Sequence, residues 1–233
     1  MITFKSHASS SKGNCYTVSD GKTTILLECG LPFKVLCKVI GRPLSEYSAC
    51  LVTHEHKDHS KCADKLAAAG IPVYMSAGTA DALGMSCVEM LENLKQVEIG
   101  TISVMPFDVS HDAAEPLGFF IRGKDGDVMM FATDTYSVHY SMPCRMMALE
   151  CNHDKALLER CDRLPENVRH RTYRNHMDIG RLCKYLGGLD LRQCTDIYLM
   201  HLSGAFSRET EFEGRVRKCV PSWVDVHVCD AGR

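Results

Sequence analysis

One short segment of the sequence carries an unusual density of side chains that bind divalent metal ions. Residues 53–59 read Thr-His-Glu-His-Lys-Asp-His and directly follow an apolar run. Imidazole and carboxylate are preferred ligands of zinc and related transition metals. In an extended segment His54 and His56 point the same way and can bind one ion. Asp58 and His59 follow where the chain turns and can face a second ion, so the segment predicts two ions rather than one.

The same pattern, an apolar strand that ends in a polar ligand, occurs three more times along the chain. The later residues are His111, Asp134 and His201, each of which follows an apolar run. Loops at strand ends are where ligands gather in α/β sheets. The predicted ligands form three groups: His54, His56 and His111 for one ion, Asp58, His59 and His201 for the other, and Asp134 as the bridge between both.

A pair of divalent ions at such a site favours hydrolysis. Two ions that share a bridging water lower its pKa toward neutrality, which provides hydroxide, and they can also hold the attacking and leaving oxygens. Phosphate esters suit this chemistry because positioning and electrostatic stabilisation supply most of their catalysis. Besides Asp58, we predict that His153 or His176 takes part in catalysis by donating a proton to the leaving oxygen.

A basic stretch follows in the second half of the chain. Between Lys155 and Arg181 the cationic side chains are Arg160, Arg163, Arg169, His170, Arg171 and Arg174. Arginine is suited to bidentate phosphate contacts, so a basic rim beside a metal site could collect a nucleotide or a nucleic-acid end. We predict that Arg171 and Arg174 bind substrate. The alternative, a solvated helix face, stays open.

In these residues the chain resembles the metallo-β-lactamase superfamily. Residues 54–59 match its HxHxDH motif without a gap, and its later ligands match His111 in Ser-His-Asp, Asp134 in Thr-Asp-Thr and His201 in Met-His-Leu-Ser. The resemblance implies an α/β (α+β) fold, the αββα sandwich, with two mixed sheets flanked by helices. It also implies a dinuclear site that holds zinc or, in some members, manganese.

A narrower resemblance is to the YycJ/WalJ-type branch, which is described as exonuclease-like. Residues 9–14 are similar to its SGSSGN turn and residues 150–154 to its E-x-N-H-D segment. These matches imply that Asn14 and Asn152 lie near the substrate, and the His of the branch's GHLSN stretch favours His176 as the proton donor. The sequence departs from the family at Glu28, where an Asp is usual, which leaves the orientation of the histidine partner of Glu28 open.

Length and composition fit one globular domain over residues 1–233. The formal charge is −2, and 45% of the residues are hydrophobic, which excludes a disordered chain, collagen or a coiled coil. No apolar run is long enough to span a bilayer and no secretory signal precedes the domain, so we expect a cytoplasmic protein. The 13 cysteines include no CxxC pair and are interpreted as reduced thiols.

Alternating strand and helix patterns predict the elements that position these residues. Strands are expected at residues 2–4, 15–18, 23–27, 49–53, 72–75, 102–105, 118–121, 128–132, 146–149, 196–200 and 224–228. Helices are expected at residues 33–40, 61–69, 77–94 with a break allowed at Gly84, 155–164, 178–186 and 208–219, the last capped by Ser207. Asp125-Gly126 predicts a hairpin turn.

The sequence therefore predicts a dinuclear metal-dependent phosphodiesterase that acts on nucleic acid, most simply as an exonuclease. One alternative keeps the mechanism but degrades small cyclic nucleotides, as some phage-encoded members of the superfamily do. Another is a binding protein whose ions only stabilise the fold. A homodimer is left open.

Overall fold

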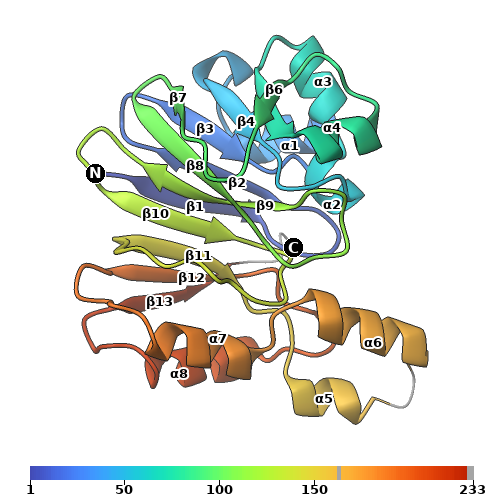
Figure 1. The fold of residues 1–233 in the computed structure, drawn as a ribbon, viewed down its shortest axis with the longest axis vertical. Coiled ribbons are helices and arrows are strands. Elements are labelled where there is room, and N and C mark those ends of the chain that lie inside the picture. Colours follow the sequence, from blue (N-terminus) through green and yellow to red (C-terminus); the bar gives the residue numbers. More distant parts are fainter. Residues whose placement is uncertain (162–163, 230–233) are drawn as a thin grey trace. The chain divides into compact units, whose positions relative to one another are not determined.

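The computed structural model describes residues 1–161 and 164–229, which divide into two compact units (Figure 1). In the described part of the chain, unit 1 comprises Met1–Asp108 and Ala113–Val128. Unit 2 comprises Val109–Asp112 and Met129–Cys229. Each unit supplies part of the predicted ligand set.

Unit 1 is built on a mixed six-stranded sheet. Its strands, in spatial order, are β1 (Thr3–Ala8), β2 (Cys15–Ser19), β3 (Thr24–Leu27), β4 (Ala49–Leu51), β5 (Val73–Ser76) and β6 (Glu89–Leu91). The strands from β1 to β3 pair antiparallel, and those from β3 to β6 pair parallel. Cys50 lies opposite both Leu26 and Val73, and these buried side chains belong to one apolar cluster. β4, which precedes the histidine-rich segment, is therefore anchored on both sides.

Four helices accompany this sheet, namely α1 (Phe33–Ile40), α2 (Lys57–Ser60), α3 (Ala63–Ala68) and α4 (Ala77–Leu83). A 3-10 turn, η1, covers Leu44–Glu46. Leu36 of α1 and Leu66 of α3 are buried in the apolar cluster of the sheet. Unit 1 also contains the antiparallel strands β7 (Val97–Ile99), β8 (Ile102–Asp108) and β9 (Leu117–Arg122). A hydrogen bond of 2.9 Å between Thr23 and Thr101 joins the edge of β7–β8 to the start of β3.

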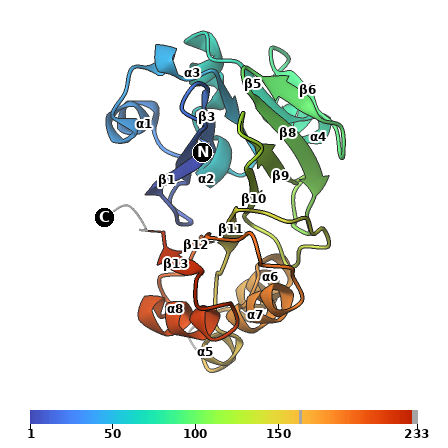
Figure 2. The ribbon, with the colours of Figure 1, turned by 90° about the vertical axis from the view of Figure 1, so that its left-hand side faces the viewer.

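Unit 2 has four parallel strands and four helices. The strands are β10 (Val128–Ala132), β11 (Met146–Glu150), β12 (Asp196–Met200) and β13 (Asp225–Val228). The helices are α5 (Lys155–Glu159), α6 (Glu166–Asn175), α7 (Ile179–Gly187) and α8 (Glu209–Arg217). Figure 2 shows α7 and α8 on the same side of β11–β13, which they cover with buried leucine, phenylalanine and valine side chains. Because the strands are parallel, their carboxyl ends share one edge.

Most of the predicted elements are confirmed, since each predicted strand overlaps an observed one and the Asp125-Gly126 turn is present. The predicted helix 77–94 is wrong beyond Leu83. Gly84 adopts a left-handed conformation (φ 65°) that ends α4, and the chain continues into strand β6. Strands β6 and β7 were not predicted because they are only three residues long and lack clear alternation.

Three further differences concern helices. Helix α5 ends at Glu159, short of the predicted 155–164, and residues 162–163 of that prediction lie outside the described residues. Ser207 is not the cap of α8, because its hydroxyl donates to the carbonyl of Ser203 and Arg208 takes the cap position. Helices α2 and α6 were not predicted. No residue of α6 is buried, so it shows no apolar stripe.

Within the described residues, no helix is long and apolar enough to span a membrane.

The packing of Gly30 against the histidine-rich segment gives a test of this fold. A Cβ at Gly30 would lie 1.6 Å from the carbonyl oxygen of Asp58. We expect Gly30→Ala to lower the free energy of unfolding by about 3 kcal/mol, because the backbone of one segment must move. Gly214→Ala in α8 is the matched control, since its Cβ meets nothing within 4 Å. It should change stability by no more than about 1 kcal/mol, in the stabilising direction. Equal urea midpoints for both variants would contradict the close packing.

Candidate functional site

In unit 1 the histidine-rich segment leaves β4 as a short extended stretch and then turns into α2. The turn is fixed by backbone hydrogen bonds, because the amides of His59 and Ser60 donate to the carbonyl of His56 at 2.9 and 3.0 Å. The Ser60 hydroxyl also donates to the carbonyl of Glu55 at 2.7 Å. This local structure holds the extended histidines and the helical Asp58-His59 pair in fixed directions.

The structure brings the predicted ligands of unit 1 together in pairs. Nε2 of His54 and Nδ1 of His56 are 3.0 Å apart, and Nε2 of His59 lies 3.4 Å from Oδ2 of Asp58. Two nitrogens bound to one tetrahedral zinc would be about 3.3 Å apart, so the His54–His56 pair has a suitable separation. The other nitrogen of His54 lies 2.8 Å from the Thr53 hydroxyl, as is usual for a histidine ligand.

Two buried polar residues lie next to the His59 ring. Oε2 of Glu28 lies 3.6 Å from Nδ1 of His59, so the longer carboxylate still faces this imidazole. The Asn14 amide nitrogen lies 3.2 Å from Nε2 of His59 and donates to the carbonyl of Asp58 at 3.1 Å. Asn14 also accepts from the amide of Ser10. The predicted contact between Asn14 and substrate stays a prediction, while the structure places this residue against a predicted ligand.

In unit 2 the predicted bridging residue, Asp134, faces two predicted ligands with its two oxygens. Oδ1 lies 3.2 Å from Nδ1 of His201, and Oδ2 lies 3.7 Å from Nε2 of His111. Nδ1 of His111 donates to the carbonyl of Asn175 at 3.1 Å, which fixes the ring. Within unit 2, therefore, each oxygen of Asp134 faces a different predicted ligand, and its bridging role stays a prediction.

Glu150 is a site residue to which the sequence analysis gave no role. It is fully buried at the carboxyl end of β11, and its Oε1 lies 2.6 Å from Nδ1 of His176 and 3.2 Å from Nδ1 of His201. Its Oε2 accepts from the amides of Thr135 and Met177 at 2.8 and 3.0 Å. Glu150 ends an apolar strand just as the predicted ligands do, and that signal could have identified it.

The contacts of Glu150 shift two pKa values in opposite directions. Burial alone would raise the pKa of Glu150, but the charge and hydrogen bond of His176 and the hydrogen bond from His201 hold it well below its ordinary value. Burial acts to lower the pKa of His176, and the Glu150 carboxylate reverses this and raises it. The Glu150 carboxylate therefore favours the protonated form of His176.

The chemistry of the donor set in unit 2 suits a transition-metal ion. One ligand atom from each of Asp134, Glu150, His176 and His201 lies within 4.8 Å of the others. In His201, Nδ1 is the atom that faces the two carboxylates. Histidine ligands of metals commonly give this outer N–H to a carboxylate and bind the ion through the other ring nitrogen. The imidazole and carboxylate groups of unit 2 therefore fit a metal ion.

The backbone at these strand ends is unusual. Among the described residues, non-glycine residues with positive φ are Glu28 (66°), Leu94 (60°), Asp134 (44°) and His201 (53°). Such conformations cost on the order of 1 kcal/mol or more and persist where the surrounding structure enforces them, often at functional sites. Three of the four residues belong to the candidate site, which supports a functional reason for their placement.

The other predicted site residues lie in unit 2. Asn152 is buried and its amide donates to the carbonyl of His201 at 2.9 Å. His153 is also buried, neither ring nitrogen has a hydrogen-bond partner among the described residues, and burial lowers its pKa. Arg171 and Arg174 are exposed on α6, and Nε of Arg171 donates to Asp112 at 2.6 Å. Arg163 of the basic stretch lies outside the described residues.

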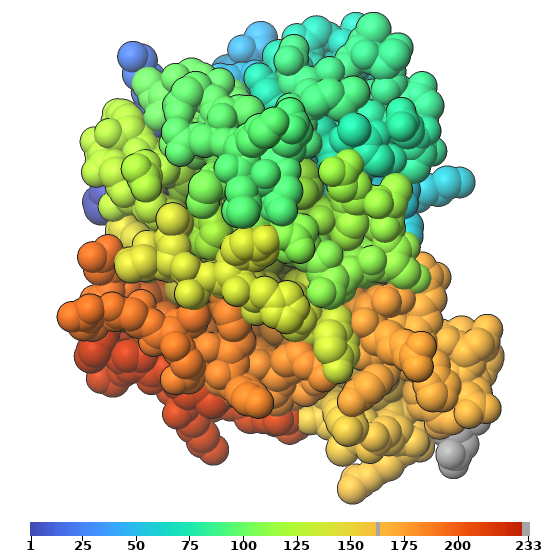
Figure 3. Space-filling model, viewed as in Figure 1, coloured from blue at the N-terminus to red at the C-terminus, as the bar shows by residue number. Residues whose placement is uncertain are grey.

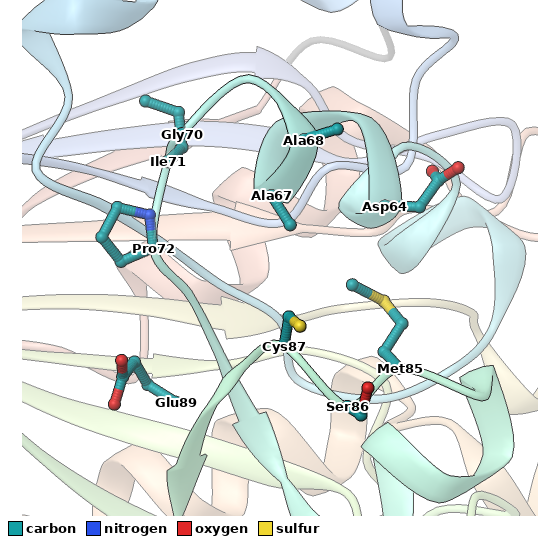
Figure 4. A pocket seen from close by; sticks show the side chains of 10 residues that line it. All are labelled: Asp64, Ala67, Ala68, Gly70, Ile71, Pro72, Met85, Ser86, Cys87 and Glu89. Atoms are coloured by element: carbon teal, nitrogen blue, oxygen red, sulfur yellow. The ribbon is translucent and has the colours of Figure 1, made fainter.

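Unit 1 also contains a hollow of about 600 Å³. It is formed by α3 and the segments that lead into β5 and β6, and its lining includes Asp64, Met85, Cys87 and Glu89 (Figure 4). None of its ten lining residues belongs to the predicted site. The lining of this hollow therefore gives no support to the predicted site residues.

The sequence is similar to known proteins over most of its length. A family model described as "Beta-lactamase superfamily domain" matches residues 23–201. The sequence is 32% identical to exodeoxyribonuclease YycJ of Bacillus anthracis over 223 residues, which covers 87% of this chain and 83% of the relative. It is 30% identical to exodeoxyribonuclease WalJ of Streptococcus pneumoniae, over 65% of this chain and 62% of the relative.

Solved structures show the same fold. The metallo-β-lactamase fold protein YhfI of Bacillus subtilis matches with a TM-score of 0.76 at 14% identity, over 100% of this chain and 98% of that one. The short form of human tRNase Z matches with a TM-score of 0.67 at 12% identity, over 100% and 98%. The predicted fold class, an αββα sandwich with two mixed sheets flanked by helices, is confirmed.

The contact between Glu150 and His176 gives a second prediction. Replacing Glu150 by Gln removes a buried negative charge 2.6 Å from the ring, so the protonated imidazole loses its stabilising partner. We expect the pKa of His176 to fall by about 1 to 3 in metal-free Glu150→Gln protein. Histidine NMR titrations measure this directly, with exposed His170 as the internal control. A His176 that titrates at the same pH in both proteins would refute the pairing.

Proposed function

Because the chain belongs to the metallo-β-lactamase superfamily and is a metal-dependent hydrolase, we propose that it is a nuclease that cleaves phosphodiester bonds at the ends of DNA. The observation that carries the substrate assignment is the 32% identity with an exodeoxyribonuclease over 83% of that relative. The strand-end carboxylates and imidazoles of each unit support the hydrolytic chemistry.

We propose that the seven predicted ligands hold two divalent ions. The supporting observations are the His54–His56 and Asp58–His59 pairs in unit 1 and the two-sided placement of Asp134 in unit 2. A set rich in imidazole favours zinc, with manganese as the alternative. When bound, such ions supply an activated water and offset charge on the phosphate oxygens.

In this proposal His176 is the residue that gives a proton to the leaving oxygen. Its Nδ1 is engaged by Glu150, so Nε2 is the atom that can transfer a proton. Glu150 raises the pKa of His176, which favours the protonated ring that a general acid requires. His153, the other predicted donor, is fully buried and its pKa is lowered, so it suits this role less well.

The substrate contacts are proposed for both units. Arg171 and Arg174 present guanidinium groups on α6, and such groups bind phosphate in a bidentate manner. The partner of Arg171, Asp112, lies 3.5 Å from the predicted ligand His111, which supports a role for this arginine beside the predicted ligands of unit 2. We propose that Asn14 and Asn152 act mainly by orienting His59 and His201 beside the substrate.

We also propose a cytoplasmic location and a single functional domain formed by both units. The described residues include all 13 cysteines and form no disulfide, which suits a reducing compartment. The family match over residues 23–201 includes parts of both units.

The role of Asp134 can be tested by metal analysis together with turnover. Wild-type protein should contain close to two ions per chain and shorten linear DNA from its ends. Asp134→Ala should lose at least one ion and lower kcat by about 1,000-fold or more, because a shared ligand is removed. His139→Ala, at an exposed histidine of unit 2, is the control and should keep both properties. A fully active Asp134→Ala protein would refute the bridging role.

A substrate panel tests the proposed nuclease activity itself. We expect linear DNA to be degraded and covalently closed circular DNA to resist, because an exonuclease requires an end. Hydrolysis of cyclic nucleotides with linear DNA left intact would replace the proposal with the cyclic-nucleotide alternative. Tight binding of metal without hydrolysis of any phosphodiester would indicate a metal-stabilised binding protein.

A further inference from the structure

Helices α5 and α6 of unit 2 enclose a second hollow, of about 290 Å³. Figure 3 shows the two helices as a gold and orange lobe that stands out from the other helices of this unit. The hollow is lined by Lys155, Leu158 and Glu159 of α5 and by Arg169, His170 and Tyr173 of α6. None of these residues is among the ligands, catalytic residues or substrate contacts assigned above.

The lining combines the three kinds of surface that a nucleotide requires. The buried Leu158 side chain gives an apolar floor, and the half-buried Tyr173 ring gives an aromatic wall. Nζ of Lys155 lies 5.3 Å from the centroid of that ring, which places a cation beside the aromatic face. Bases stack on aromatic side chains without regard to sequence, and neighbouring cations bind the phosphate.

The cationic groups around the hollow can exchange their carboxylate partners for a phosphate. Lys155 pairs with Glu159 at 3.8 Å, and His170 pairs with Glu166 at 3.5 Å. All four side chains are more than half exposed, so these pairs contribute little and are readily replaced. The segment 155–181 carries seven Lys and Arg against four Asp and Glu, a net charge of +3 in a chain of −2.

Core packing does not explain the sequence of α6. No residue of this helix is buried, and it presents Arg169, His170, Arg171 and Arg174 together with Tyr173. A helix that is polar all round gains little from burial in its own domain. Its basic and aromatic composition is instead typical of a surface that binds nucleic acid.

The distance along α6 between the hollow and the predicted ligands of unit 2 suits a short DNA strand. Asn175 ends α6 and accepts from His111, and the next residue is His176. Arg169 precedes His176 by seven residues, about 10 Å along an α-helix. This corresponds to about three nucleotides of a stacked strand.

From these observations we infer that the α5–α6 hollow binds one nucleotide of a DNA strand, about three positions from the bond that is cleaved. This inference rests on the proposed nuclease function and adds a binding site to it. The volume fits a single nucleotide, since pockets for ligands of that size begin at roughly 300 Å³. The hollow would increase affinity for strands long enough to reach it.

The test compares binding by four metal-loaded proteins that share the wild-type melting temperature. The probe is a labelled ten-nucleotide single strand with phosphorothioate linkages, which keep the charge and resist cleavage. We expect Arg169→Ala/Tyr173→Ala to raise Kd about ten-fold or more, since one stacked base contributes roughly 1–3 kcal/mol. Tyr173→Phe keeps the ring and should bind normally, as should Arg192→Ala, a control whose exposed side chain pairs with Asp190.

Cleavage by the same proteins separates this inference from the proposed function. The ratio of kcat/KM for an unmodified decanucleotide to that for a dinucleotide should fall about ten-fold in Arg169→Ala/Tyr173→Ala, because a dinucleotide is too short to reach the hollow. Equal Kd values for the double variant and the wild type, or no binding by the wild type, would overturn the inference. A wild-type protein that binds DNA through the hollow but cleaves no DNA would instead overturn the proposed nuclease function.

Discussion

A fully buried carboxylate must be matched by donors, and this requirement organises the candidate site of unit 2. Leaving such a charge unpaired in the protein interior costs several kcal/mol. Glu150 meets the requirement with two imidazoles and two backbone amides, which come from segments far apart in the sequence. Its four contacts fix the loop after β10, the end of α6 and the histidine after β12. The same carboxylate therefore helps to set the positions of His176 and His201, and it favours the protonated form of His176.

The strained backbone at the strand ends also serves to bring buried charged side chains to their partners. Asp134 and His201 each follow a buried parallel strand, where a regular continuation would carry the side chain past the shared edge. A single residue with positive φ turns the chain sharply and lets the side chain face its partner at that edge. Glu28 makes the corresponding turn after β3 in unit 1, and its carboxylate faces His59. Strain at these residues is balanced by the hydrogen bonds and packing that it makes accessible.

Much of this organisation could be predicted because the strand-end pattern is local. An apolar run followed by His or Asp identified His54, His111, Asp134 and His201 directly from the sequence, and the resemblance to a family supplied the fold. Glu150 follows the apolar run 146–149 in the same way, but its partners could not be predicted from this pattern. Its role depends on His176, 26 residues away, and on His201, 51 residues away. Sequence spacing alone gives no measure of contacts that only the packed strands create.

Helix α6 escaped prediction for the opposite reason, since it has no buried face to produce a periodic pattern. Its carboxyl end is fixed instead by the contacts of Asn175 and His176 with the site residues of unit 2. A helix held mainly at one end can present a continuous basic surface along the rest of its length. Because the surface is not needed for the core, its charges are free to be selected for a ligand. The polar sequence of α6 thus explains why the helix could not be predicted from a periodic pattern. The same sequence suits the helix to binding an extended, negatively charged DNA strand.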